Sequence, residues 1–205
     1  ETSSEDIEFD GGDFRISGTD RVIDFASLAA RLRAQGRGDA LDTELSMETP
    51  PSAFPNGCHV AEVEVDPLTG VMDIVRYVVV DDFGTLINPM LVEGQVHGGI
   101  AQGIGQAIME HTAYDHDAQL VAGSYMDYQL PRAADLPSSF AFGSHPVPAA
   151  TNPLGAKGCG EAGTTGSLPA VMNALVDALH SACGINHIDM PATSERIWRV
   201  LEQGK

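Results

Sequence analysis

The alternation of apolar and polar residues between His59 and Val80 predicts a β-hairpin. One side of the first strand carries Val60, Glu62 and Glu64, and the other carries Ala61, Val63 and Val65. This two-residue period is typical of a strand with one face on a core. A turn sequence, Asp-Pro-Leu-Thr-Gly, leads to a second strand at 72–80, whose apolar end predicts that both of its faces are covered. Asp81 and Asp82 should accept backbone hydrogen bonds in the turn that follows.

Spacings of three and four residues between apolar positions predict four helices. The first three are expected at 25–35 after the cap Asp24, at 91–110 after Asn88-Pro89, and at 168–183 between the cap Ser167 and Gly184. A last helix should follow Pro191, with Thr193 or Ser194 as its cap. The residues of this last helix expected to face inward are Ile197, Trp198, Val200 and Leu201. Each range therefore has residues suited to starting or stopping a helix.

The helix at 91–110 has two different faces. Its apolar face, which should contact a core, consists of Val96, Ile100, Ile104, Ala107 and Ile108. The opposite face carries Gln95, Gln102 and Gln106, interleaved with Gly98 and Gly99. Glycine inside a helix costs about 0.5–1 kcal/mol relative to alanine, so its repeated use indicates close packing. Two interpretations stay open: another helix packs there, or a flat polar ligand does, with the glutamine amides donating and accepting hydrogen bonds.

The remaining segments are shorter and less regular. Strand candidates are 14–16, 119–122, 124–128 and 140–144, and residues 1–6 are a chain end or part of a strand. Residues 36–56 form a connection much longer than the usual loop of about 4–6 residues. The mixture of strands and helices indicates an α+β fold, a two-layer arrangement of mixed sheets with helices. We expect an N-terminal segment at 1–56 and a domain at 57–205.

The balance of charge narrows the range of partners. The 205 residues include 29 Asp and Glu against 11 Lys and Arg, a formal net charge of −18. Such a chain repels phosphate backbones and anionic lipids, so we expect neither nucleic acid nor membrane as a partner. The three cysteines fit neither a disulfide framework nor a zinc motif, which favours a reducing cytoplasm. No apolar run approaches the roughly 18 residues of a membrane span.

The most distinctive chemistry surrounds Glu161. Residues 157–163 read Lys-Gly-Cys-Gly-Glu-Ala-Gly. Glycine lets the backbone approach a bound group closely, and the helix predicted after this stretch offers free N–H donors and a positive dipole end. The loop is therefore able to hold an anion beside a base. Taken alone, the pattern is better explained by an ordinary glycine-rich loop with a surface glutamate.

Four motifs in order give the chain a resemblance to a known family. They are Asp-Asp-x-Gly-x-x-x-Asn-Pro at 81–89, Gly-Gln-Val-x-Gly-Gly-x-x-Gln-Gly-x-Gly at 94–105, Tyr-Gln-Leu-Pro at 128–131 and Lys-Gly-x-Gly-Glu-Ala-Gly at 157–163. Together they resemble the molybdenum hydroxylases, the family of xanthine dehydrogenase, aldehyde oxidase and aerobic carbon monoxide dehydrogenase. The resemblance covers essentially the whole chain and is firmest from Phe54 onward.

The resemblance implies a cofactor and roles for particular residues. The cofactor is expected to be molybdenum held by molybdopterin, in its plain form or as a cytosine dinucleotide. Glu161 is expected to be the catalytic base beside the metal, and the oxygen added to the substrate is expected to come from water. The positions expected to bind the cofactor are Gln95, Gly98, Gly99, Gln102, Lys157, Gly158, Gly160 and Thr164. No side chain is expected to ligate a metal, since His111 and His116 lack a third partner at useful spacing.

The resemblance also implies that the chain is one part of a larger protein. It corresponds to the C-terminal part of the family's large subunit, and the upstream half shapes the substrate pocket. The parent is expected to hydroxylate an aldehyde, an N-heterocycle or carbon monoxide, passing electrons to iron–sulfur and FAD groups on other domains or subunits. The isolated chain is expected to be inactive. A noncatalytic cofactor-binding or assembly module that pairs with a second chain is the alternative, and a hydrolase that uses Cys159 is a third.

Overall fold

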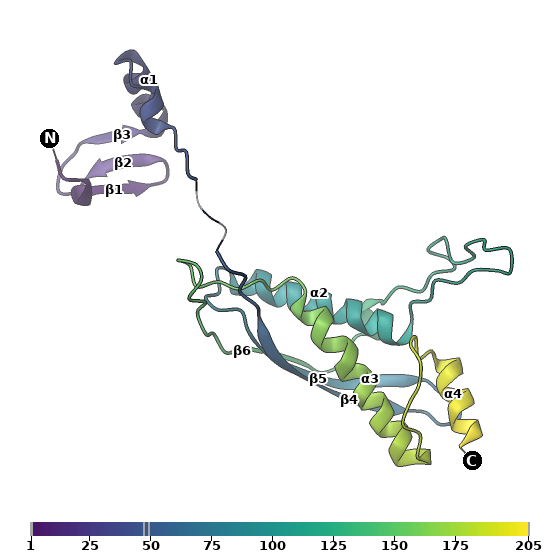
Figure 1. Cartoon of the computed structure of the whole chain (residues 1–205). Coiled ribbons are helices and arrows are strands. Elements are labelled where there is room, and N and C mark those ends of the chain that lie inside the picture. The colour runs from purple at the N-terminus through teal and green to yellow at the C-terminus, as the bar shows by residue number, and fades with distance from the viewer. Residues whose placement is uncertain (1, 47, 49, 205) are drawn as a thin grey trace. The chain divides into compact units, whose positions relative to one another are not determined.

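The computed structural model describes residues 2–46, 48 and 50–204, which separate into two compact units, Glu1–Thr49 and Pro50–Lys205 (Figure 1). The division falls earlier in the chain than the boundary expected after residue 56. Within the described residues, no helix combines the length and the apolar character that crossing a lipid bilayer requires.

The first unit is a small antiparallel sheet followed by one helix. Short 3-10 turns lie at η1 (Ser4–Asp6) and η2 (Gly38–Leu41), and strands β1 (Ile7–Asp10), β2 (Asp13–Ile16) and β3 (Val22–Asp24) precede α1 (Phe25–Ala34). The strands pair in sequence order. Asp24 caps α1 by accepting a hydrogen bond from the N–H of Ser27 at 2.8 Å, which confirms the predicted cap. Among the described residues this unit contains no fully buried side chain.

The second unit is built on a mixed three-stranded sheet. Its strands are β4 (Asn56–Val65), β5 (Met72–Asp82) and β6 (Phe140–Ser144), with β4 antiparallel and β6 parallel to the central β5. The predicted hairpin is confirmed, and Asp66 closes its turn by accepting hydrogen bonds from Leu68 and Thr69. The sheet and its helices confirm the predicted α+β class.

Three helices pack on this sheet. They are α2 (Pro89–Ile108), α3 (Ala162–Cys183) and α4 (Ser194–Gln203), and a 3-10 turn, η3, lies at Ala133–Asp135. Figure 1 shows α2 and α3 beside each other over the sheet, with α4 near the far end of α3. Asn88 caps α2 and Thr193 caps α4, each by accepting a hydrogen bond from a backbone N–H.

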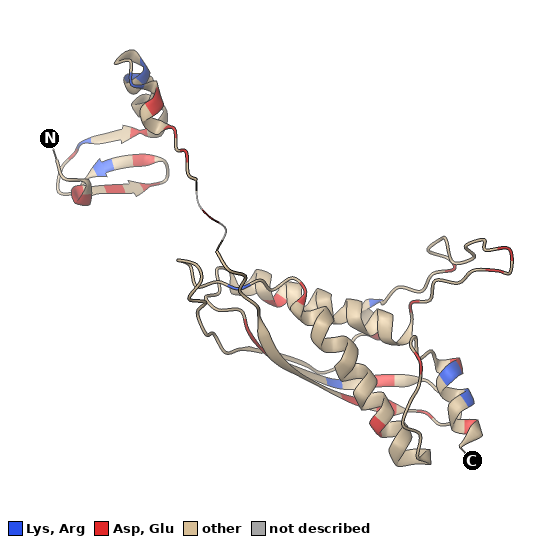
Figure 2. Cartoon of the chain, viewed as in Figure 1, with Lys and Arg blue, Asp and Glu red and all other residues tan. Residues whose placement is uncertain are grey.

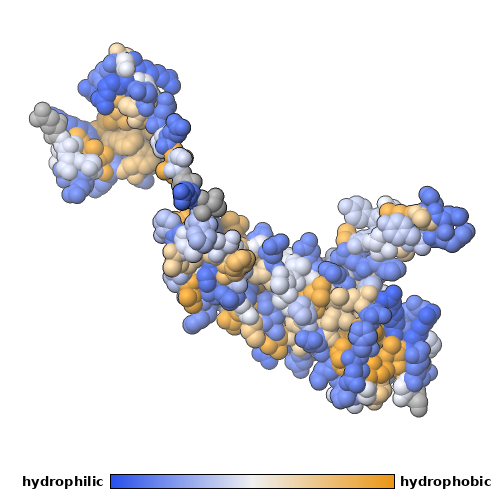
Figure 3. Space-filling model, viewed as in Figure 1, coloured by the Kyte–Doolittle hydropathy of each residue, from blue (hydrophilic) through white to orange (hydrophobic). Residues whose placement is uncertain are grey.

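The apolar faces of these elements form two adjacent core clusters. The first joins the sheet to α2 and α3 and includes Tyr77, Val79, Val96, Ile100, Ile104, Ala107 and Val171. The second joins α3 to α4 and includes Leu175, Leu179, Ile197 and Leu201. The apolar face predicted for α2 is therefore confirmed, with Ile108 partly buried. Figure 3 shows hydrophobic surface near α4. Val176 and Val200 are only partly buried against the second cluster, and Trp198 is 40% exposed.

Several expectations about single elements were wrong. The helix expected after Ser167 begins at Ala162 instead, and Ser167 is buried inside it against α2. Tertiary packing of the glycine-rich first turns on α2 offsets their weak helix propensity. The segments 119–122 and 124–128 are not strands, since only an isolated bridge from Leu120 to Tyr114 pairs there. Trp198, expected to face inward, lies at the surface.

The second strand of the hairpin is covered on one face rather than two. Val80 is 45% exposed, and its antiparallel neighbour Cys58 is exposed as well. The helices of the described chain cover only the face that carries Tyr77 and Val79. An apolar run therefore identified the strand but not what lies on its second face.

Candidate functional site

Glu161 lies where the glycine-rich loop becomes α3. It is the N-cap residue: its carbonyl accepts a hydrogen bond from the N–H of Thr165 at 2.9 Å, and its side chain makes no capping hydrogen bond. The carboxylate is exposed. The N–H groups in the first turn of a helix lack intrahelical acceptors, so Glu161 stands beside a donor-rich backbone. Any group that binds here meets a carboxylate and free N–H donors together.

The end of β5 holds the loop before Glu161. The Lys157 ammonium donates to Oδ2 of Asp82 at 2.5 Å, with side chains 11% and 12% exposed. Oδ1 of Asp82 accepts from the N–H groups of Gly84 at 2.8 Å and Val147 at 2.9 Å. The hydrogen bond from Lys157, and then those two backbone bonds, lower the pKa of Asp82 to about 2. The structural role predicted for Asp82 is confirmed.

Gln95 on α2 approaches the same loop. Its amide makes no hydrogen bond to another described residue, and a Cβ placed on Gly160 would lie 3.9 Å from its Oε1. Gln95 lines a hollow of about 250 Å³ together with Lys157 and Cys159. Glu161 lines another hollow, of about 310 Å³. Gln95 therefore approaches the residue before Glu161, while the two side chains line different hollows.

Gln102, Gly99 and Thr164 form a contact between α2 and α3. The Thr164 hydroxyl lies 3.1 Å from the carbonyl oxygen of Gly99 and 3.1 Å from Oε1 of Gln102. A Cβ on Gly99 would lie 2.9 Å from the backbone nitrogen of Thr164. In contrast, a Cβ on Gly98 or Gly158 would meet nothing within 4 Å. Helix packing thus explains Gly99, whereas Gly98 leaves open backbone on the exposed side that carries Gln95.

The Tyr-Gln-Leu-Pro motif packs on the C-terminal end of α2. The Tyr128 hydroxyl donates to Oε2 of Glu110 at 2.6 Å, and this hydrogen bond raises the pKa of Tyr128. A Cβ on Gly105 would lie 2.6 Å from Cγ of Pro131. The last glycine of the α2 motif therefore makes room for the Tyr-Gln-Leu-Pro segment. Two motifs separated in the sequence form one packed unit.

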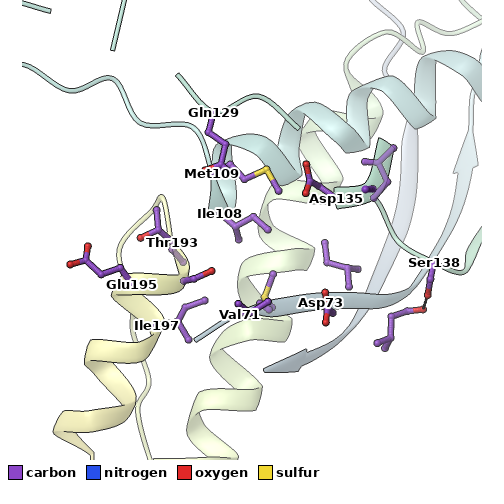
Figure 4. Close-up of a pocket in the computed structure, with 17 residues that line it drawn as sticks. Val71, Asp73, Ile108, Met109, Gln129, Asp135, Ser138, Thr193, Glu195 and Ile197 are labelled. Carbon is purple, nitrogen blue, oxygen red and sulfur yellow. Dashed lines mark hydrogen bonds between the residues drawn. The ribbon is translucent and has the colours of Figure 1, made fainter. Parts of the chain in front are cut away.

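A larger hollow than these two lies at the other end of α2, and none of the predicted site residues lines it. Its volume is about 620 Å³, and Ile108, Met109, Asp135 and Glu195 are among its lining residues (Figure 4). Figure 4 shows that the start of β5, the end of α2 and the N-terminus of α4 contribute to it. Size alone therefore does not identify the site with the predicted chemistry.

Sequence reasoning missed one group of buried polar residues beside Glu161. His59 and Asp81 line the same hollow as Glu161. His59 Nδ1 lies 2.8 Å from the Tyr77 hydroxyl, and Nε2 lies 3.3 Å from Oδ1 of Asp81. Burial, and secondly the charge of Asp81, raise the pKa of Tyr77, so its phenol stays protonated beside the His59 ring. The signal that could have found His59 was a histidine on the inward side of an alternating strand.

Charge and thiols add little to the site. Figure 2 shows Lys and Arg residues scattered over α1, β2, β5 and α4, with Asp and Glu on strands and helices as well as on loops. Cys159 is partly buried and packs against the apolar core, as expected for a structural thiol rather than a nucleophile. Among the described residues, no three His, Cys, Asp or Glu side chains are grouped to hold a metal ion.

Comparisons with known proteins agree with the motifs. A family model described as a molybdopterin cofactor-binding domain matches residues 1–137. The carbon monoxide dehydrogenase large chain of Hydrogenophaga pseudoflava is 33% identical over 99% of this chain and 26% of its own length. The nicotine 6-hydroxylase large subunit of Paenarthrobacter nicotinovorans is 34% identical over 98% of this chain and 25% of its own length.

A solved structure gives the same result for the fold. Quinoline 2-oxidoreductase from Pseudomonas putida 86 superposes with a TM-score of 0.75 at 35% identity, covering 98% of this chain and 26% of that protein. The chain thus spans about a quarter of the length of the relatives it matches. Since the family model matches most of the chain and these relatives cover nearly all of it, the chain belongs to the molybdopterin cofactor-binding domain family of the molybdenum hydroxylases.

Proposed function

We propose that this chain forms one wall of the molybdenum cofactor site in the large subunit of a molybdenum hydroxylase, with Glu161 as the catalytic base. The observation that carries the proposal is the exposed Glu161 at the N-terminus of α3, directly after Gly160, whose backbone the Gln95 amide approaches. Because the chain spans about a quarter of the length of its relatives, the other walls of the site would come from the rest of that subunit. In this proposal the chain is its C-terminal part and is inactive by itself.

The residues present suit a flat polar group such as a pterin. The Gln95 amide offers a donor and an acceptor that no described residue uses. Gly98 and Gly158 leave open backbone where a Cβ would meet nothing within 4 Å. Lys157 is paired with Asp82, so the loop backbone rather than its ammonium would face the cofactor. Gln102, Gly99 and Thr164 would support this surface by fixing α2 against α3.

The chain would contribute proton chemistry and orientation. When bound, the cofactor would accept the two electrons that leave the substrate. The Glu161 carboxylate would accept the proton that water loses as its oxygen is added to the substrate, a role that typically contributes about 10²–10⁴-fold to the rate. Gln95 would hold the pterin by hydrogen bonds, close to the loop that presents Glu161. The loop from Gly158 to Gly160 would let both groups approach closely.

The relatives suggest the class of substrate. Their names include carbon monoxide dehydrogenase, nicotine 6-hydroxylase and quinoline 2-oxidoreductase. We therefore favour carbon monoxide or an N-heterocycle as the substrate. An aldehyde comes third, because the aldehyde oxidoreductase of Desulfovibrio gigas matches only 72% of this chain. The same proposal includes iron–sulfur and FAD partners, a cytosine dinucleotide form of the pterin and a cytoplasmic location. The noncatalytic module is not favoured, since these relatives are named as enzymes.

The test is Glu161→Gln in the complete enzyme that contains this chain. We expect bound molybdenum to be unchanged and turnover per molybdenum to fall by about 10²–10⁴-fold, since the amide cannot accept the proton. Glu62→Gln, on the exposed side of β4, serves as the matched control with parental turnover. Turnover of Glu161→Gln within a factor of two of the parent would remove Glu161 as the base.

A further inference from the structure

The His59 ring is enclosed between the β4–β5 hairpin and α3. Its side chain is 7% exposed and that of Asp81 is 2% exposed. The Tyr77 hydroxyl lies 2.8 Å from Nδ1 of His59, and the two rings contact each other edge to face with centroids 5.9 Å apart. Asp81 lies 3.3 Å from the other ring nitrogen. Contacts on both nitrogens fix the orientation of the ring.

Two glycines make the space that this arrangement needs. Gly57 pairs with Asp81 across the hairpin, and a Cβ on Gly57 would lie 1.8 Å from Oδ1 of Asp81. Gly166 lies on α3, and a Cβ there would lie 2.4 Å from both Cδ2 and Nε2 of His59. The backbone of α3 therefore rests directly on the ring. Any larger residue at position 166 would have to move either the helix or the ring.

The ring gives α3 a second point of contact close to Glu161. On its other side α3 is held by α2, where a Cβ on Gly163 would lie 2.5 Å from the carbonyl oxygen of Val96. On the side of the ring, α3 packs against β4, the strand that carries His59, so the ring is part of the contact that fixes the helix on the sheet. At a rise of about 1.5 Å per residue, Glu161 is only about 7–8 Å along the axis from Gly166. A shift at Gly166 would therefore displace the Glu161 carboxylate.

We infer that His59, held by Tyr77 and Asp81, is a positioning residue that sets where α3 presents Glu161. This inference rests on the function proposed for Glu161. His59 itself touches neither the cofactor nor the substrate in this scheme. Its effect on the rate follows from geometry, because a displacement of about 1 Å in a reacting group is able to lower turnover by about 10²-fold.

The test is a double-mutant cycle with Gly166→Ala and His59→Ala in the cofactor-loaded complete enzyme. We expect Gly166→Ala to lower kcat per molybdenum by about 10–100-fold, with KM and molybdenum content near parental values. In the His59→Ala background the added methyl group has room, so Gly166→Ala should then change kcat by less than about threefold. Ser181→Thr, which adds a methyl group at an exposed position of α3, is the control.

A second readout does not depend on turnover. Hydrogen exchange of the amides at 162–167 should become faster in Gly166→Ala and return toward the parental rate in the double variant. Equal effects of Gly166→Ala in both backgrounds, or parental kcat in Gly166→Ala, would overturn the inference. If Gly166→Ala does not accumulate, Tyr77→Phe replaces it. That variant should then show faster exchange at 162–167 and a lower kcat, and parental values for both would equally overturn the inference.

The two proposals fail in different ways. If Glu161→Gln keeps its turnover, Glu161 is not the base, yet the exchange rates still report whether His59 fixes α3. If Glu161→Gln is inactive while the effects of Gly166→Ala and His59→Ala on kcat are additive, Glu161 is still the base, but His59 does not position it. A merely structural role for His59 would lower molybdenum content and yield, but not the kcat of each loaded site.

Discussion

The Lys157 ammonium and the Asp82 carboxylate form an ion pair between the glycine-rich loop and the last residue of β5. This pair joins positions that are 75 residues apart in the sequence. Because Asp82 also accepts hydrogen bonds from Gly84 and Val147, one carboxylate fixes three segments around the loop that leads to Glu161.

The Asp82 carboxylate should make stability depend on pH in the acid range. Its pKa is lowered to about 2 in the folded chain, against about 3.9 for an unfolded aspartate. A depressed folded pKa gives stability that is fully present above about pH 4 and is lost as the pH falls through about 2. We expect Asp82→Asn to lower the melting temperature by several degrees at pH 6 and by much less near pH 2.

Thermal unfolding at both pH values measures this difference. Lys157→Met should shift the melting temperature in the same direction, since it removes the ammonium group that lowers the pKa of this carboxylate most. Asp73→Asn, at an exposed position of β5, provides the control. An Asp82→Asn effect that is equal at pH 6 and pH 2 would show that the ion pair does not contribute to the pH dependence.

Gln95 and Gln106 allow a matched test of cofactor binding on α2. Both are exposed glutamines on one helix, but only Gln95 lies beside the loop that carries Glu161. We expect Gln95→Ala to lower the molybdenum and pterin content of the purified complete enzyme by about tenfold, because a good hydrogen bond is lost from an enclosed site. Gln106→Ala should retain parental content. Equal molybdenum and pterin content in the two variants would mean that the cofactor does not bind at Gln95.

Gly163, at the α2–α3 contact, and Gly98, on the exposed side of α2, should differ sharply in their tolerance of a methyl group. Gly163→Ala places a Cβ 2.5 Å from the carbonyl oxygen of Val96, and such overpacking typically costs about 1–3 kcal/mol. Gly98→Ala meets nothing within 4 Å, and should stabilise the chain by about 0.5–1 kcal/mol through helix propensity. Urea unfolding followed by Trp198 fluorescence compares the two. A Gly163→Ala variant as stable as the parent would mean that the helices separate easily.

The second unit should fold without the first. Residues 1–49 contain no fully buried side chain among those described, whereas both apolar core clusters lie in residues 50–205. We therefore expect a chain of residues 50–205 to unfold at the same urea midpoint as the whole chain, with Trp198 as the probe. A clearly lower midpoint would mean that residues 1–49 stabilise the sheet or its helices.

The sequence by itself determined the elements whose signals are local. The alternation around Ala61 and Val63 specified the hairpin, helical spacing specified α2 and α4, and Asp24 and Thr193 specified helix starts. These predictions held because strand period and capping depend on residues within one or two turns of each other. The motifs likewise identified the family, since they are read from the order of residues alone.

Only the tertiary structure decided features that depend on distant neighbours. α3 begins at Ala162 rather than after Ser167 because α2 supplies contacts for its glycine-rich first turns. The Lys157–Asp82 pair and the His59–Tyr77–Asp81 group exist because separate segments come together. No local pattern encodes such contacts: their free energy arises from burial and close approach between segments, which is present only once the chain has folded.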